Sequence, residues 1–270
     1  MHAWSPEWWW LAYLALGLVV GFFAGMLGIG GGVIIVPLLV FLFTAQHFPE
    51  QRVLHLALGT SLASIVFTNL SSVRAHDLRG GVRWDIVIAA APAVIAGTLL
   101  GTLVAARMPS RYLAIIFTVF VFFSSLRMWA DREPKPTRTL PGKLGLSTAG
   151  LLVGALCSLV GVGGGILVIP LMTICNVPMI NAIGTSAALG LPISLGGALG
   201  YIVTGLNQPG LPPLSLGYIY IPALAGLVVG SFVTVPFGVH VAHRMPVIAL
   251  RRIFAIILFA LATKMLVSLV

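Results

Sequence analysis

Charge is scarce in this 270-residue chain, and acidic charge is the scarcest. Charged residues make up 8% of the sequence, with 15 Lys and Arg but only 6 Asp and Glu. A soluble domain usually carries about 25% charged residues, because its surface must stay solvated. Hydrophobic residues make up 59% of this chain. The composition excludes a soluble enzyme, a secreted disulfide-rich protein and a disordered chain, and it predicts a polytopic integral membrane protein.

Cysteine and enzyme motifs are also nearly absent. Cys157 and Cys175 lie within apolar sequence and form no CxxC pair, so metal and redox roles are not predicted. The sequence has no HExxH, no GxSxG and no paired carboxylates within a span, which argues against an enzyme. We therefore expect no catalytic residue, no metal and no cofactor. Basic residues lie in short loops between apolar segments, which is typical of orientation signals and not of nucleic-acid binding.

Long apolar segments fill most of the chain. A membrane-spanning helix needs about 20 mostly apolar residues. Six segments meet this requirement: 53–73, 84–106, 111–129, 181–203, 214–239 and 249–269. Two further apolar stretches, 8–43 and 144–176, are interrupted by glycine clusters. A charged, proline-rich segment divides the chain, so we expect a first repeat at 1–129, a linker at 130–143 and a second repeat at 144–270.

The two halves resemble each other in sequence. GFFAGMLGIGGGVIIVPLLV (21–40) aligns with GALCSLVGVGGGILVIPLMT (154–173), with seven of the twenty positions identical. Six of these seven are Gly or Pro. Further along, ALGTSLA (57–63) aligns with AIGTSAA (182–188). Chance resemblance between apolar segments would not repeat glycines, prolines and a GTS triplet in the same order, so the pattern indicates an internal duplication.

The Lys and Arg residues indicate how the two repeats are oriented. If each glycine-broken stretch crosses the membrane once, the loops on the two sides hold nine and six basic residues. If each forms a hairpin that returns to its starting side, loops 74–83, 127–143 and 240–252 share one side, and the counts become eleven and four. The positive-inside rule favours the hairpins, because basic residues concentrate in the cytoplasm. Corresponding loops of the two halves then lie on opposite sides of the membrane.

The expected fold is therefore an all-α polytopic membrane protein with two inverted-topology repeats. Each repeat is a glycine-broken helical hairpin followed by three transmembrane helices. The linker 130–143 is expected in the cytoplasm and both termini outside, while the hairpins are either re-entrant or pairs of short full spans. Inverted repeats are the usual construction of secondary transporters, which hold their substrate near the middle of the membrane with broken helices.

Two glycine clusters, GIGGG (28–32) and GVGGG (161–165), are the most informative motifs. Each glycine destabilises a helix by about 1 kcal/mol relative to alanine. A half-helix that follows such a break exposes free N–H groups and the positive end of its dipole, which together favour an anion without any basic side chain. The alternative is that the glycines serve close helix packing. The candidate substrate-binding residues are Gly28, Gly30, Gly31, Gly32, Gly161, Gly163, Gly164 and Gly165, with Pro37 and Pro170 as structural helix breaks.

Hydroxyl side chains in the GTS triplets are the next candidates. Thr60, Ser61, Thr185 and Ser186 could complete the hydrogen bonds of an anion without adding charge. Equally, such hydroxyls bond back to their own helix or to a neighbouring one. Further hydroxyls recur on the same face of the first triplet's helix, with Asn69 beside them: Ser61, Ser64, Thr68 and Ser71. His55, near the external start of that span, is an ionisable candidate for protonation or substrate contact.

The paired glycine clusters, each followed by a proline and then by a GTS triplet, and separated by a central linker, resemble the TauE/SafE family of membrane transporters. The resemblance covers nearly the whole chain. It implies an inner-membrane permease for small sulfur-containing anions such as sulfite, sulfoacetate or other organosulfonates. It also implies binding roles for the duplicated elements, which here are the two glycine clusters and the Thr-Ser pairs.

We therefore expect a secondary transporter, acting as an exporter of small sulfur-containing anions by alternating access, with the anion bound at the two glycine breaks. One alternative is an anion channel whose selectivity filter is formed by the same glycine breaks. Another is a membrane-embedded assembly or regulatory subunit without transport of its own. The expected partners are the small anionic substrate and the lipid bilayer, with no nucleic acid. The sequence does not identify a coupling ion, for which a proton and sodium are the two candidates. The expected location is the inner (plasma) membrane.

Overall fold

Helices form nearly all of the chain that the structure describes. The computed structural model describes residues 6–27, 31–130, 139–242 and 247–267. These residues form ten helices: α1 (Pro6–Leu27), α2 (Gly32–Ala45), α3 (Glu50–Asp77), α4 (Trp84–Arg107), α5 (Ser110–Trp129), α6 (Lys143–Val160), α7 (Gly165–Ile174), α8 (Met179–Gly205), α9 (Ile221–Ala242) and α10 (Val247–Val267). A short antiparallel ribbon, β1 (Ser215–Leu216) and β2 (Ile219–Tyr220), precedes α9. The all-α prediction is confirmed apart from this ribbon.

Six of the described helices are long and apolar enough to cross a membrane. They are Glu50–Asp77, Trp84–Arg107, Ser110–Trp129, Lys143–Val160, Met179–Gly205 and Ile221–Gly238. Five of them correspond to predicted spans. The sixth, α6, was predicted as the first arm of a hairpin, whereas the predicted span 249–269 corresponds to α10, which is not among the six. The structure is therefore that of a multi-pass membrane protein.

The predicted span 214–239 begins too early in the sequence. Its first residues form the β1–β2 ribbon, and α9 starts only at Ile221. Pro212 and Pro213 interrupt helical hydrogen bonding just before this point. Gly217 then forms the turn with a φ of +56°, which a glycine adopts at little cost. Hydropathy missed the ribbon because most of its residues are as apolar as those of a span.

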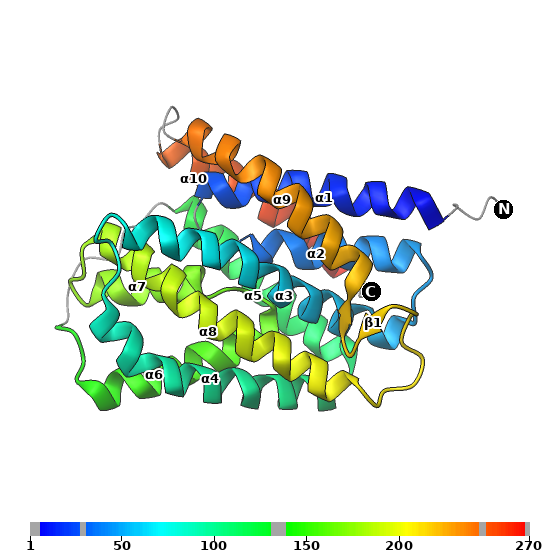
Figure 1. Ribbon diagram of the computed structural model, residues 1–270, viewed down its shortest axis with the longest axis horizontal. Helices are drawn as coiled ribbons and strands as arrows, with labels where there is room; N and C mark the ends of the chain where they lie inside the picture. The colour runs from blue at the N-terminus through cyan, green and yellow to red at the C-terminus, as the bar shows by residue number, and fades with distance from the viewer. Residues whose placement is uncertain (1–5, 28–30, 131–138, 243–246, 268–270) are drawn as a thin grey trace.

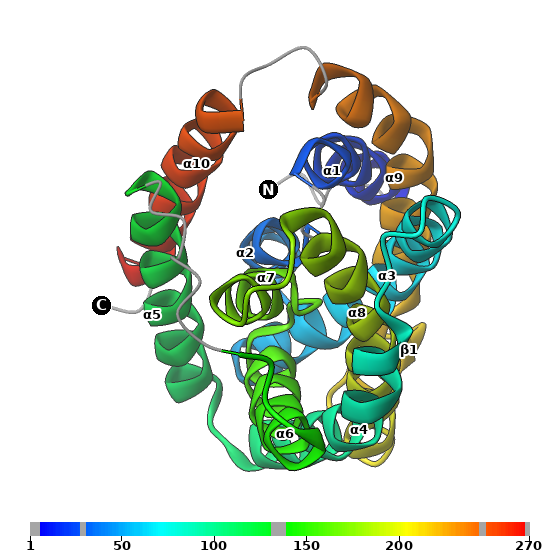
Figure 2. The same ribbon diagram turned by 90° about the vertical axis from the view of Figure 1, so that its left-hand side faces the viewer.

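The two halves of the chain pack into one core. Helix α1 lies along α9, α4 lies along α6, α3 packs against α8, and α5 packs against α10. Each of these contacts joins a helix of the first half to one of the second. Figure 2 shows α2 and α7 in the middle of the molecule, with the longer helices around them. The short helices that follow the two glycine breaks therefore lie in the interior of the bundle.

Glycines allow the closest of these helix contacts. A Cβ atom built on Gly97 of α4 would collide with the carbonyl oxygen of Leu151 on α6, and would lie 2.8 Å from its carbonyl carbon. A Cβ atom on Gly154 of α6 would likewise collide with the carbonyl oxygen of Val94 on α4. Gly97 begins a GxxxG motif that ends at Gly101. Small residues at this spacing let two helix backbones touch, as in other membrane bundles.

The short helices α2 and α7 point in opposite directions. We call the end of the molecule that carries β1 and β2 the β end. Helix α2 starts near the middle of the molecule and runs toward the β end, whereas α7 runs toward the opposite end (Figure 1). Helix α1 begins, and α10 finishes, at the β end (Figure 1). The N-termini of α2 and α7 therefore both lie in the middle of the bundle.

Pro37 and Pro170 do not break helices, contrary to the sequence-based expectation. Pro37 lies inside α2 and Pro170 inside α7, and both helices continue past them. A proline within a membrane helix removes one N–H group, which the surrounding helices and nearby side chains compensate. The helical bond that Pro170 cannot make is the one to the carbonyl of Ile166, four residues earlier. The breaks lie at the glycines instead.

Candidate functional site

The two glycine breaks touch each other in the interior. A Cβ atom on Gly32, the first residue of α2, would lie 2.8 Å from the carbonyl oxygen of Gly161 and 3.2 Å from Cα of Val162. Such contacts leave no room for a side chain at Gly32. The structure thus brings together Gly32 and Gly161 from segments 129 residues apart in sequence. Gly28 and Gly30 lie outside the described residues.

Glycines in the left-handed region shape both breaks. Gly31 precedes α2 with a φ of +64°, and Gly164 precedes α7 with a φ of +88°. Gly161 ends α6 with a φ of +69°. Residues with a Cβ atom pay roughly 1–2 kcal/mol in this region, so glycine is the natural occupant. The conformation explains why the chain stops one helix and starts another at these positions.

The N-termini of α2 and α7 carry no side-chain cap. Neither Gly31 nor Gly164 supplies a capping side chain. The first intrahelical bonds of α7 run from the N–H groups of Leu167 and Val168 to the carbonyl of Gly164. The N–H groups of the first residues of the helix, Gly165 and Ile166, precede these bonds and have no intrahelical acceptor. They can therefore bind a hydrogen-bond acceptor, above all an anion, at the positive end of the helix dipole.

Ser61 holds one of the breaks in position. Its side chain is fully buried, and its hydroxyl donates to the carbonyl oxygen of Gly161 over 2.9 Å. A hydroxyl has a single hydrogen to donate, so in this state Ser61 has none left for a bound anion. Of the four predicted hydroxyl candidates, Ser61 is the one seen bonded to a described break residue. The contact makes it a support of the break.

Thr60 and Thr185 tie the two halves together at points away from the breaks. The backbone N–H of Tyr220, at the end of β2, donates to the hydroxyl of Thr60 over 3.0 Å. The backbone N–H of Arg83, just before α4, donates to the hydroxyl of Thr185 over 3.0 Å. Both threonines are fully buried. Ser186, also buried, follows Thr185 on α8.

The remaining hydroxyls on the same face of α3 bond to their own helix. Ser64 donates to the carbonyl of Ser61 over 2.8 Å, and Thr68 donates to that of Ile65 over 3.1 Å. Back-bonding of this kind is common for Ser and Thr within helices. The alternative interpretation from the sequence is therefore correct for these side chains.

Asn69 is a polar residue of the interior for which no role was predicted from the sequence. Its side chain is 5% exposed, and its amide nitrogen Nδ2 has no hydrogen-bond partner among the described residues. A Cβ atom on Gly163 would lie 3.3 Å from this nitrogen. The amide therefore lies beside the break before α7. The sequence carried one signal, an amide next to the hydroxyl face of an otherwise apolar span.

A basic cavity of about 880 Å³ opens at the β end. Three arginines line it, Arg52, Arg107 and Arg111, together with Glu50 and His55. These three are most of the four basic residues that the hairpin arrangement leaves on this side. Their positive charge raises the local concentration of anions at the mouth of the cavity.

His55 and Arg52 are held by protein contacts at this cavity. The His55 ring is 2% exposed, stacks on Tyr218 with 5.0 Å between the ring centroids, and lies 3.0 Å from the carbonyl oxygen of Ala105. Arg52 donates to the Tyr218 hydroxyl over 2.8 Å. Burial raises the pKa of the Tyr218 phenol, so it accepts this bond in its neutral form. The contacts give His55 a structural role in joining α3 to the end of α4.

Aromatic rings fill the interior between α2 and the β end. Tyr13, Phe43, Phe48 and Tyr220 form edge-to-face and stacked pairs with centroid separations of 5.2–6.2 Å. The side chain of Gln46 donates to the Tyr13 hydroxyl. Tyr13 and Phe43 are almost fully buried. This cluster joins α1, α2 and β2 at the β end.

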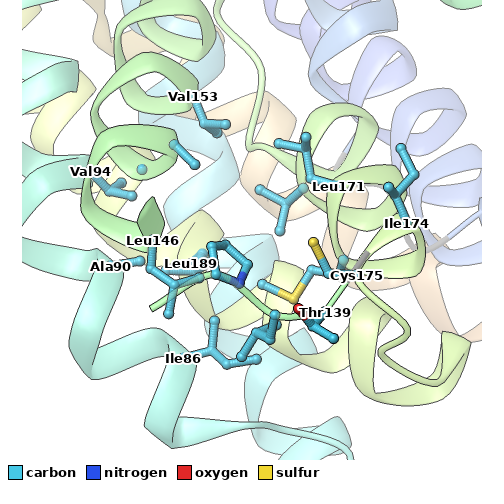
Figure 3. A pocket seen from close by; sticks show the side chains of 16 residues that line it. Ile86, Ala90, Val94, Thr139, Leu146, Val153, Leu171, Ile174, Cys175 and Leu189 are labelled. Carbon is cyan, nitrogen blue, oxygen red and sulfur yellow. The ribbon is translucent and has the colours of Figure 1, made fainter. Parts of the chain in front are cut away.

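A second cavity, of about 620 Å³, lies on the opposite side of the breaks along α7. Its lining comes from α4, α6, α7, α8 and residues 139–141, and it is almost entirely aliphatic (Figure 3). Thr139 and Cys175 are the polar exceptions that point toward it in Figure 3. Among the residues that the structure describes, no charged side chain lines this cavity. Its surface suits an apolar group and offers nothing to an anion.

The helices define a multi-pass membrane protein, and comparison with known sequences narrows its class. Residues 13–265 match the family described as Sulfite exporter TauE/SafE. Because the match covers most of the chain, the protein belongs to the TauE/SafE sulfite exporter family. It is a probable membrane transporter and not an enzyme.

Relatives from distant organisms cover nearly the whole chain. A probable membrane transporter protein of Haemophilus influenzae is 35% identical over 257 residues, which are 94% of this chain and 97% of the relative. One from Methanocaldococcus jannaschii is 26% identical over 86% of both chains. One from Bacillus subtilis is 26% identical over 89% of this chain and 92% of the relative. No solved structure gives a significant match.

Proposed function

We propose that this protein is an exporter of small sulfur-containing anions, such as sulfite or organosulfonates, that works by alternating access. The anion binds at the breaks before α2 and α7. The observation that carries the proposal is the contact of Gly32 with Gly161, which joins the two breaks beside uncapped helix N-termini deep inside the bundle. Donors of this kind bind an anion without a basic side chain.

The distribution of acidic residues supports an anionic substrate. All six Asp and Glu residues lie in the linker or within the first or last two residues of a helix. None is positioned along the interior of a span, where it would repel an anion or serve as a cation ligand. The basic cavity at the β end adds an attractive field at one mouth. The breaks therefore lie in surroundings that favour negative charge.

Paired contacts support the proposal of two inverted repeats, 1–129 and 144–270. Thr60 binds the N–H group just before α9, and Thr185 binds the N–H group just before α4. Cβ atoms on the preceding residues, Gly59 and Gly184, would collide with the carbonyl oxygens of Tyr218 and Gly81. Corresponding residues of the two halves therefore make corresponding contacts, each with the opposite half. Pseudo-symmetry of this kind lets a transporter adopt a second state by exchanging the conformations of its two halves.

Loop positions support the proposed orientation in the plasma membrane. The loop between α3 and α4 lies at the end opposite the β end, as do the end of α5 and the start of α6 (Figure 1). The segments assigned to that end carry eleven of the fifteen Lys and Arg residues. We place that end, with the linker 130–143, in the cytoplasm and both termini outside.

Reporter fusions test this orientation. A fluorescent reporter inserted after residue 135 is expected to fold and emit, because the linker is cytoplasmic. A periplasmic phosphatase fused after residue 270 is expected to be active, because the C-terminus is outside. The reverse fusions, exchanged between the two positions, serve as controls and should be silent. A fluorescent C-terminal fusion would overturn the inverted-repeat proposal.

Counterflow into proteoliposomes tests the function. The purified protein is expected to take up labelled sulfite, thiosulfate, taurine or sulfoacetate in a saturable way, and faster when the same anion is trapped inside. Protein-free liposomes are the control. Uptake that does not saturate and shows no acceleration would instead indicate an anion channel. No uptake of any of these anions by folded, inserted protein would contradict the proposed transport.

A further inference from the structure

We infer that Asn69 of α3 is a direct ligand of the transported anion, so that the anion binds asymmetrically, at the N-terminus of α7. The inference rests on the proposed function and adds to it a side-chain donor and a choice between the two breaks. The motivating observation is a buried amide beside the backbone before α7, whose nitrogen has no hydrogen-bond partner among the described residues.

The position of the amide relative to the break is specific. A Cβ atom on Gly163 would lie 3.3 Å from Asn69 Nδ2 and 4.0 Å from Asn69 Oδ1. Gly163 immediately precedes Gly164, the residue that caps α7. The donor end of the amide is therefore nearer the break than its acceptor end.

Glycines on two elements let the backbone approach the amide closely. A Cβ atom on Gly190 of α8 would lie 2.5 Å from Asn69 Nδ2 and 2.7 Å from the carbonyl oxygen of Gly163. With Gly163 on the other side, the amide nitrogen meets backbone from both directions. No hydroxyl or carbonyl among the described residues satisfies it. A buried donor without a partner costs about 1–3 kcal/mol, and nearly all such groups in proteins are paired.

A cost of this size indicates a partner that is present in one step of the cycle and absent in another. An anion fits, because the amide and the first residues of α7 both offer N–H groups. A cation does not suit these groups, because N–H groups direct their hydrogens, which carry partial positive charge, toward the ligand. Two separate sets of donors suit a ligand with at least two acceptor oxygens. The ligand class is therefore a small oxyanion such as a sulfite or a sulfonate group.

The second half of the chain has no matching donor. Alignment of the GTS triplets pairs Asn69 with Ser194 of α8. Ser194 is fully buried, and its hydroxyl donates to the carbonyl of Leu191 over 3.1 Å. Its hydrogen is thus used within its own helix. The difference between the two positions is the reason for expecting one preferred anion position.

Three variants test the inference in the counterflow assay with sulfite, thiosulfate, taurine and sulfoacetate as probes. Asn69→Ala removes the donor and is expected to weaken the apparent affinity about tenfold or more, as for a lost hydrogen bond to a charged group. Asn69→Asp replaces both N–H groups with a carboxylate and is expected to abolish uptake. Ser64→Ala is the matched control on the same helix, because the Ser64 hydroxyl bonds to its own helix. Its affinity should stay within about twofold of wild type, since that bond takes no part in binding.

Thermal unfolding separates a ligand from a structural residue. Asn69→Ala removes an unsatisfied buried group, so its melting temperature without anion should match or exceed that of wild type. The rise in melting temperature that the transported anion gives to wild type should be lost in this variant. Asn69→Ala with wild-type affinity, or with a lower melting temperature and a normal anion-induced rise, would overturn the inference while leaving the proposed function intact. Absence of counterflow in wild type would overturn the proposed function itself, and this inference with it.

Discussion

Replacing Gly164 with leucine is expected to abolish anion binding while leaving a folded, inserted protein. Gly164 has a φ of +88°, which a leucine adopts only with strain of roughly 1–2 kcal/mol. Its Cβ atom would also lie 2.6 Å from Cδ1 of Ile193. The chain can relieve the backbone strain and the close contact with Ile193 by moving the break. That movement displaces the N–H groups at the start of α7. Counterflow measures the loss of anion affinity, and the melting temperature, with and without anion, measures whether the protein stays folded.

Gly80 provides the matched control for this substitution. It has a φ of +64°, like the break glycines, but a Cβ atom there would meet nothing within 4 Å. Gly80→Leu therefore carries the same backbone strain without touching the breaks, and it should retain wild-type affinity. Gly31→Leu, at a φ of +64° before α2, is expected to weaken binding less than Gly164→Leu, because it reaches the anion position at α7 only through the contact of Gly32 with Gly161. Wild-type affinity in both Gly31→Leu and Gly164→Leu would exclude the breaks as the binding site.

The sequence predicted the helices and the glycine breaks because both depend on local properties. Twenty apolar residues suffice to indicate a span, and glycines in the left-handed region at Gly31, Gly161 and Gly164 end one helix and begin another. The order of five helices in each half follows from these signals alone. Pro37 and Pro170 were interpreted wrongly because the effect of a proline depends on its neighbours. Inside a packed bundle, neighbouring helices can satisfy the carbonyl group that the missing N–H group leaves without a helical partner.

The chemical roles of the polar residues were harder to predict because they depend on contacts between the halves. Thr60 meets Tyr220 across 160 residues of sequence, and Thr185 meets Arg83 across 102. No local pattern reveals such pairs. From the sequence, a hydroxyl that binds the anion and a hydroxyl that bonds to another part of the protein were therefore equal alternatives. Asn69 shows the opposite case. Its type and its place beside the hydroxyl face were visible in the sequence, but its burial and its lack of a partner among the described residues became visible only once Gly163 and Gly190 were placed around it.

The other large effect is expected from Gly97→Leu, which should prevent a stable fold instead of weakening binding. A Cβ atom there would collide with the carbonyl oxygen of Leu151 and would lie 2.9 Å from its Cα atom. Backbone cannot rotate away as a side chain can, so α4 and α6 must separate. Overpacking typically costs 1–3 kcal/mol, and about 3 kcal/mol or more is expected here because two helices lose their contact. Size-exclusion profiles in detergent and thermal unfolding check the result.

Ala96→Leu is the control for Gly97→Leu, because Ala96 is exposed on the neighbouring face of α4 and a leucine there meets no packed backbone. It should behave like wild type. Gly154→Leu approaches the same contact from α6 and should fail in the same way, since its Cβ atom would collide with the carbonyl of Val94. A monodisperse Gly97→Leu protein with wild-type melting temperature would show that α4 and α6 need no such contact. Substitution of these glycines thus has one of two effects. At Gly97 and Gly154, where helices cross, it removes stability. At Gly31 and Gly164, where helices begin, it lowers the anion affinity.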